Sequence, residues 1–176
     1  MLRATSRVGP VRYGGRVIEV RQPTPADLDA LADILSAAEL DCDPEGVQCW
    51  VAVEPGVEGV HKVIGGVIAD FNYGDYGSTV PPGHGDNHAY IFAIAVAPAG
   101  QRKGAGRALI RRVAEGAHAV GLSFLVLMPQ ERRADEVGEH IPFFRACGLN
   151  SLAPERHMSP YGAPVLEILE RLRLDS

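Results

Sequence analysis

The chain has 176 residues, of which 46% are apolar and 22% are charged, and its formal net charge is −5. This composition fits one soluble globular domain with a sizeable core, and the net negative charge argues against nonspecific DNA binding. No apolar run approaches the ~20 residues that span a bilayer, and no apolar signal-peptide core follows the basic N-terminus. Cys42, Cys49 and Cys147 form no disulfide framework or zinc motif, so we expect a cytoplasmic protein without a metal.

The first part of the chain predicts a lead-in, a strand and a helix. Residues 1–15 are expected to be a flexible lead-in to a single domain over residues 16–176. Residues 16–21 alternate in polarity and predict a strand. Thr24 is suited to cap a helix whose first residue is a proline. The positions that then recur at helical spacing are Leu28, Leu31, Ile34 and Leu35.

Two strands and a long loop are expected next. Residues 48–53, with the single tryptophan Trp50, and residues 60–69 predict strands. The Gly65-Gly66 pair inside the second strand indicates a bulge or a close backbone approach. Residues 70–87 are rich in Gly, Pro, Asn and Asp and predict a long loop, of a kind that is often functional.

The second half begins with a strand, a helix and another strand. Residues 88–96 predict an apolar strand, and the helix that follows Gly104 should end at Gly121. The continuous apolar run 122–128 predicts a strand that is covered on both faces.

The remaining elements are shorter. A polar loop over residues 129–139 should precede a short helix near 142–147, which Gly148 closes, and residues 165–169 predict a final strand. Consecutive strands in the middle favour antiparallel pairing, and the strand–helix–strand unit over 88–128 favours one parallel pair. We therefore expect an α/β (α+β) fold, with a mixed, mostly antiparallel sheet flanked by helices.

The segment Gln101-Arg102-Lys103-Gly104-Ala105-Gly106-Arg107-Ala108 holds the strongest functional signal. A helix N-terminus carries partial positive charge and favours acidic residues, yet this first turn has none and is rich in basic residues. A bound phosphate would make that arrangement favourable. Leu109 occupies the position of the third glycine of a dinucleotide-binding fingerprint, and GxxxxGK[ST] is absent, so neither nucleotide motif is met.

The chain resembles the GCN5-related N-acetyltransferase (GNAT) family. The resemblance lies in the strand end at Ala95-Val96, Pro98, the segment 101–108, and Ile141-Pro142-Phe143-Phe144-Arg145-Ala146-Cys147-Gly148-Leu149, which is similar to the family's late FYxxxGF helix. It covers residues 88–149. It implies a GNAT-like fold and acetyl-CoA as co-substrate.

The resemblance also implies which residues hold the donor. The backbone N–H groups of residues 102–107 would form an anion nest for the diphosphate, and Arg102 and Lys103 would add charge. Glycines at 104 and 106 would let the backbone approach closely. The strand around Ala95 would bond the pantetheine arm through the backbone of Ile94 and Val96.

The chemical step is less clear from the sequence. Related enzymes often place Glu or His where this chain has Tyr90, and a tyrosine acid where it has Phe144, which cannot donate a proton. Tyr90, Phe92, Ile94 and Val96 are expected to share one strand face that His88 extends, so His88 is a candidate base.

Other residues are candidates for chemistry but also fit plainer structural roles. Tyr90 orients substrate, donates a proton, or is an ordinary core-edge residue. Tyr161 is a candidate displaced acid or a loop tyrosine. Cys147 and Trp50 are expected to be core residues rather than a nucleophile and a substrate wall. The polar residues of the 70–87 loop that are candidate acceptor contacts, or simply solvated, are Asp70, Asp75, His84 and Asp86.

We expect an N-acetyltransferase that acts on a primary amine by direct attack in a ternary complex, because no Cys–His pairing is visible. The acceptor is a small molecule or a protein amine, with no nucleic acid or membrane partner and with a homodimer as one possible state. A CoA-binding sensor without catalysis, and an O-acyltransferase or a transferase of longer acyl chains, are the alternatives.

Overall fold

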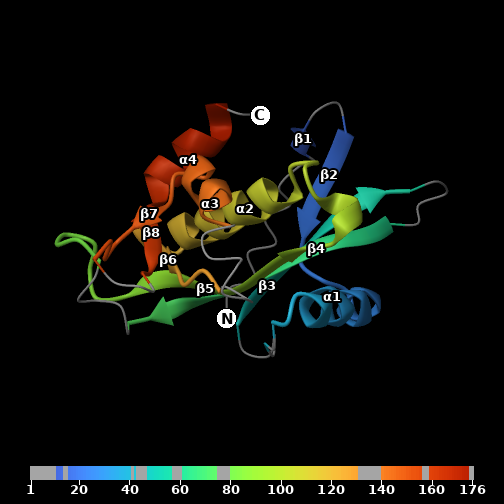
Figure 1. Cartoon of the computed structure of the whole chain (residues 1–176), viewed down its shortest axis with the longest axis horizontal. Coiled ribbons are helices and arrows are strands. Elements are labelled where there is room, and N and C mark those ends of the chain that lie inside the picture. Colours follow the sequence, from blue (N-terminus) through green and yellow to red (C-terminus); the bar gives the residue numbers. More distant parts are fainter. Residues whose placement is uncertain are drawn as a thin grey trace.

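The computed structural model describes residues 11–13, 16–40, 42, 47–56, 61–74, 80–130, 140–155 and 159–174 (Figure 1). Their elements are β1 (Val11–Tyr13), β2 (Arg16–Arg21), α1 (Pro25–Ala37), β3 (Gln48–Pro55), β4 (His61–Tyr73), β5 (His88–Val96), the 3-10 turn η2 (Pro98–Gly100), α2 (Ala105–Ala119), β6 (Phe124–Leu127), α3 (Ile141–Ala146), β7 (Asn150–Ser151), β8 (Tyr161–Pro164) and α4 (Val165–Leu174).

The strands of the described part of the chain form one sheet in the order β1-β2-β3-β4-β5-β6-β8-β7. Every neighbouring pair is antiparallel except β5 and β6, which are parallel and are joined through α2. The mixed, mostly antiparallel sheet that the sequence predicts is therefore confirmed. A parallel pair requires a crossover connection, and this crossover is the element that follows the glycine-rich segment.

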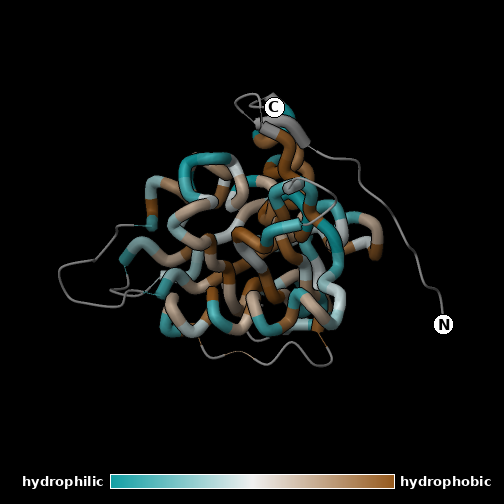
Figure 2. Tube along the Cα trace, turned by 90° about the vertical axis from the view of Figure 1, so that its right-hand side faces the viewer, coloured by the Kyte–Doolittle hydropathy of each residue, from teal (hydrophilic) through white to brown (hydrophobic). Residues whose placement is uncertain are grey.

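Helices cover both faces of the sheet. Figure 1 shows α1 on one face and α2, α3 and α4 on the other. The larger core lies beneath α2, where Leu109, Ile110 and Val113 are fully buried, and a second core packs Leu31 and Leu35 of α1 against the opposite face. Figure 2 shows apolar positions concentrated along the interior of the trace. The two layers make both faces of the central strands apolar, as burial on both sides requires.

The predicted strand over 165–169 is wrong, because these residues form the start of α4. Val165, Ile168 and Leu172 are fully buried at helical spacing, while Leu166 is exposed. A short apolar run does not distinguish a strand from a buried helix by itself. The last strands are instead β7 and β8, which the sequence analysis did not predict.

The expected lead-in over residues 1–15 is also revised. Residues 11–13 form β1 and pair with β2 in the register Val11↔Ile18, and the other lead-in residues lie outside the described part. β4 extends to Tyr73, so the predicted 70–87 loop begins later than expected. Asp75 and residues 131–139 of the predicted polar loop also lie outside the described residues.

The Gly65-Gly66 pair serves close packing, as the sequence indicates. A Cβ on Gly66 would overlap the Cδ1 atom of Leu31, and a Cβ on Gly65 would lie 2.9 Å from the backbone oxygen of Ala95. The register between β3 and β4 also shifts here, between Ala52 and Val53. Gly66 therefore allows α1 to lie directly on β4, and Gly65 allows the close approach of β5.

A buried carboxylate fixes the start of α1. The Asp27 carboxylate accepts hydrogen bonds from Arg21 at 2.6 and 3.1 Å and from the backbone N–H and hydroxyl of Thr24, both at 2.6 Å. These bonds satisfy groups at the helix start and tie α1 to β2. The Arg21 hydrogen bond is the largest cause that holds the pKa of Asp27 below its ordinary value, and the Thr24 bonds add to it.

We expect Asp27→Asn to lower the free energy of unfolding by about 2 kcal/mol at pH 7, through the lost ion pair and cap. Because the folded pKa is depressed, this stabilisation is present above the unfolded carboxyl pKa of about 3.9 and is lost as the pH falls further. Urea unfolding between pH 3 and pH 7 measures both effects, with the exposed Asp29→Asn as the control. An equal pH dependence in Asp27→Asn and the wild type would contradict this role.

Candidate functional site

A bulge in β5 determines which side chains of this strand face each layer. Ile68 pairs with Ala93 and Ala69 pairs with Ile91, so Phe92 has no partner position on β4. A bulge adds one residue to a strand and changes the side-chain alternation beyond it. The strand therefore presents different faces before and after Phe92.

The predicted common face of Tyr90, Phe92, Ile94 and Val96 is consequently wrong. Ile94 and Val96 pack against the core beneath α2, whereas Tyr90 belongs to a separate cluster with Phe124. The sequence alternation was interpreted without the extra residue, and one extra residue reverses the alternation.

The same strand separates from its parallel neighbour just after the bulge. β5 and β6 pair from Ala89↔Leu125 to Ile91↔Leu127, where β6 ends, but β5 continues to Val96. A cleft of about 880 Å³ opens there between β5, the chain after β6, α3 and the start of α2. Its described lining residues are Ala38, Leu40, Ile91, Phe92, Ala93, Ile94, Ala95, Val96, Gly100, Gln101, Arg102, Lys103, Gly104, Ala105, Gly106, Arg107, Leu127, Met128, Pro129, Gln130, His140, Phe143 and Phe144.

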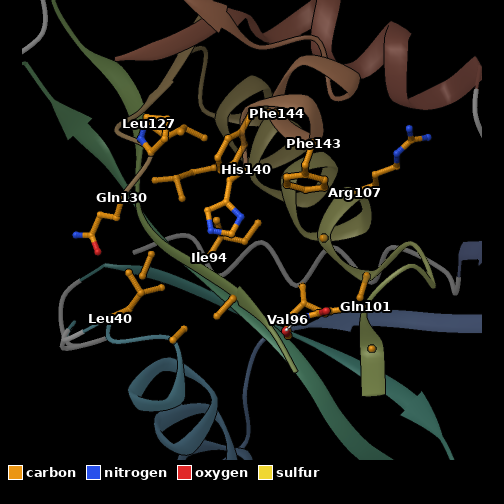
Figure 3. Close-up of a pocket in the computed structure, with 18 of the residues that line it drawn as sticks. Leu40, Ile94, Val96, Gln101, Arg107, Leu127, Gln130, His140, Phe143 and Phe144 are labelled. Atoms are coloured by element: carbon orange, nitrogen blue, oxygen red, sulfur yellow. Dashed lines mark hydrogen bonds between the residues drawn. The ribbon is translucent and has the colours of Figure 1, made fainter. Parts of the chain in front are cut away.

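The backbone of β5 supplies polar groups to this cleft. The N–H of Ala97 donates to the Ile64 oxygen of β4 at 2.9 Å. Because hydrogen-bonding positions alternate along an antiparallel strand, Ile94 and Val96 direct their N–H and C=O groups away from β4 and toward the cleft. The side-chain amide of Gln101 accordingly donates to the Val96 oxygen at 3.2 Å (Figure 3).

The loop between β5 and α2 closes one end of the cleft with backbone N–H groups. Arg102 and Gly104 have positive φ angles of 58° and 90°. The first hydrogen bond of α2 runs from the Ala108 N–H to the Gly104 oxygen at 3.0 Å, so the preceding N–H groups of the first turn have no intrahelical acceptor. With no acidic residue in that turn, the loop has the backbone geometry of an anion site.

The side chains of this loop differ in direction. The Lys103 ammonium pairs with Glu54 of β3 at 3.3 Å, so part of the charge expected for a ligand is directed to β3 instead. Figure 3 shows Arg107 directed away from the centre of the cleft. A Cβ on Gly106 would lie 2.9 Å from the Cζ atom of Phe143, so this glycine lets α3 approach α2. Ala108 is buried beneath the loop and does not line the cleft.

The sequence-predicted chemical residues lie elsewhere. His88 is fully buried beside Tyr73, and Tyr90 is buried with its ring stacked on Tyr73 at 4.3 Å. Tyr161 is a buried strand residue that pairs with Leu127 across β8 and β6. None of the three is among the described residues that line the cleft, so the structure does not bring them to it.

The described candidate acceptor contacts of the predicted 70–87 loop either have local partners or are exposed to solvent. The His84 ring lies 3.1 Å from the Ser123 hydroxyl, and the Asp70 carboxylate accepts from the Asn72 N–H at 2.9 Å. Asp86 is exposed. Cys147 and Trp50 are buried in the core, as the sequence analysis expects.

Sequence reasoning missed the imidazole in the cleft. His140 precedes α3 and lines the cleft together with Phe143 and Phe144. Figure 3 places Leu40 and Gln130 toward one end of the cleft, Gln101 and Arg107 toward the other, and His140 between them. The available signal was the spacing of four residues between His140 and Phe144, which puts both on one face of a helix.

The profile of the acetyltransferase (GNAT) family matches residues 16–149. The chain belongs to this family. The GNAT resemblance seen in the sequence is thereby confirmed. No curated protein sequence matches the chain.

Solved structures agree with the GNAT fold. Arabidopsis thaliana NAA60 in complex with acetyl-CoA is 17% identical, with a TM-score of 0.63 over 82% of this chain and 96% of that one. The Escherichia coli ribosomal-protein-S18-alanine N-acetyltransferase is 18% identical, with a TM-score of 0.53 over 84% and 94%. Thermoplasma volcanium Ard1 is 19% identical, with a TM-score of 0.56 over 84% and 97%. Within the described residues, no helix is long and apolar enough to cross a membrane.

Arg102 and Arg107 are the first and last residues of the anion-site loop (residues 102–107), and we expect them to respond in opposite ways to substitution by glycine. Arg102→Gly should raise the free energy of unfolding by about 0.5 kcal/mol, because the relief of a left-handed backbone exceeds the added unfolded-state entropy. Arg107→Gly should lower it by about 1 kcal/mol, because residue 107 is helical. Urea unfolding measures both, and destabilisation of similar size by both would contradict the backbone argument.

Proposed function

We propose that this GNAT protein transfers an acetyl group from acetyl-CoA to a primary amine by direct attack in a ternary complex. The observation that carries the proposal is the continuity of the cleft. Outward-facing backbone groups of β5 run directly into the anion-site loop at the start of α2. The backbone groups of β5 can bond the amides of an extended chain, and the N–H groups of the loop can bind a diphosphate at the end of that chain.

The donor would lie along β5 with its diphosphate on the loop. The backbone groups of Ile94 and Val96 are two residues apart and suit the successive amides of a pantetheine arm, which would add to the strand in the manner of a peptide. The N–H groups of residues 102 and 104–107 would hold the diphosphate, whereas the Lys103 N–H donates to the Gly100 oxygen at 3.4 Å. Arg102 would add charge. The acetyl-CoA complex of NAA60, which shares this fold, supports the choice of donor.

The chemistry requires a neutral amine and a proton for the departing sulfur. The amine nitrogen attacks the thioester carbon, the C–S bond breaks, and one proton passes from the nitrogen to the sulfur overall. Direct attack is supported because Cys147 is buried in the core and no cysteine is among the described lining residues. The cleft therefore offers no thiol for an acyl-enzyme intermediate.

The acceptor would enter at the end of the cleft where Figure 3 places Leu40 and Gln130. Neither side chain is charged, and the described lining residues include no aspartate or glutamate. A multiply charged acceptor such as a polyamine would find no carboxylate among them. An amine that carries no further positive charge, in a small molecule or at a protein terminus, fits this end better.

Phe144 supports a second candidate function, a CoA-binding sensor without turnover. Its phenyl ring lines the cleft at the position where the family resemblance implies a tyrosine acid. Two measurements separate the candidates. Acetyl-CoA at 100 times its dissociation constant should stabilise the protein by about 2.7 kcal/mol in thermal unfolding. Thiol release over an amine panel should then show turnover, whereas binding without turnover on any amine would favour the sensor.

Replacement of two glycines in α2 by valine tests the placement of the donor. Gly106→Val should weaken acetyl-CoA binding at least tenfold, since its side chain would displace the Phe143 ring that lines the cleft. Gly116→Val is the matched control, because a Cβ there meets the Cζ atom of Phe71 at 3.0 Å, away from the cleft. Both should lose about 1–3 kcal/mol of stability. Equal affinities in titration calorimetry would contradict the placement.

A further inference from the structure

We propose that His140 is the catalytic residue that delivers the proton to the departing CoA sulfur. The inference rests on the proposed acetyl transfer and deepens it. It assigns to an imidazole the role that a tyrosine hydroxyl at position 144 would otherwise serve.

The geometry of α3 places His140 on the same face as Phe144. His140 has helical backbone angles (φ −85°, ψ −12°), and its carbonyl oxygen accepts the Phe144 N–H at 3.2 Å. Residues four apart in a helix lie one above the other on one face. Both side chains line the cleft accordingly. A group at position 140 therefore reaches the same cleft from one turn earlier.

The imidazole occupies the middle of the cleft. Figure 3 shows it extending from the start of α3 toward β5, between Phe144 and Ile94. Ile94 is the β5 residue whose backbone would bond the pantetheine arm nearest the acceptor end. The reacting sulfur follows that arm, so it would lie within the part of the cleft that His140 faces.

The other charged lining groups are less suited to the task. Arg102, Lys103 and Arg107 belong to the anion-site loop at the far end, and Lys103 is paired with Glu54. Guanidinium and ammonium groups act mainly as fixed charges near neutral pH, whereas imidazole gains and loses a proton there. Among the described lining residues, His140 is the one that combines this chemistry with a central position.

His140 alone can carry out both proton transfers. The neutral imidazole takes a proton from the attacking nitrogen as the C–N bond forms and becomes imidazolium. It then gives a proton to the sulfur as the C–S bond breaks. The products are the acetylated amine and CoA thiol, and His140 returns to its neutral form without a further reactant.

The first test is turnover with the best amine from the panel. His140→Gln should lower kcat by roughly 100- to 10,000-fold, the usual contribution of general acid–base catalysis, and leave acetyl-CoA affinity unchanged. Adding Phe144→Tyr to His140→Gln should recover at least about tenfold, since it restores a proton donor one turn along α3. His118→Gln, on the exposed end of α2, is the control. An unchanged kcat in His140→Gln, or no recovery in the double variant, would overturn the proposal.

The second test needs no acceptor. The imidazole resonance of His140, assigned by its loss in His140→Gln, is followed by NMR during titration with CoA and with desulfo-CoA. A different shift with the two ligands is expected if the sulfur lies beside His140, and identical shifts would overturn the proposal. Absence of binding by both ligands would instead show that the proposed donor, and so the proposed function, is wrong.

Discussion

The architecture of the cleft depends on the bulge at Phe92. On the first part of β5, the parallel partner β6 takes up the backbone groups of one edge as far as Ile91. After the bulge no strand takes up that edge in the described structure, and Ile94 and Val96 direct polar backbone groups toward the cleft, where the side-chain amide of Gln101 donates to the Val96 oxygen. An unpaired strand edge can bind an extended ligand. One extra residue thus turns a continuous sheet into a sheet with a binding edge.

Glycines allow the helices around that edge to pack closely. Gly106 admits the Phe143 ring between α2 and α3, and Gly66 lets Leu31 bring α1 onto the opposite face. The chain just after α1 contributes Leu40 to the cleft, and the buried Asp27 network fixes the other end of this helix against β2. Contacts outside the cleft therefore help to position the elements that line it, because closely packed layers cannot shift independently.

The charge distribution divides the cleft into two parts. Backbone N–H groups and Arg102 gather at the loop end, while Leu40 and the uncharged Gln130 lie at the other end. His140 lies between them, next to the ring of Phe144. A donor whose anionic part is held at one end and whose reacting bond lies near the middle needs this order of groups. The same order explains why a phenyl ring at position 144 is compatible with catalysis, provided that a neighbouring side chain moves the proton.

The sequence by itself determined the elements with strong local signals. The glycine-rich segment, the strand before it and the helix ended by Gly121 have bounds set by periodicity and by backbone conformations that glycine favours. Those signals identified the family and predicted which end of the cleft would bind the donor. The tertiary structure decided the rest, because it depends on contacts between residues distant in sequence. The register with β4 reversed the face of Tyr90, burial against α2 made residues 165–174 a helix, and the approach of α3 to β5 placed His140 in the cleft.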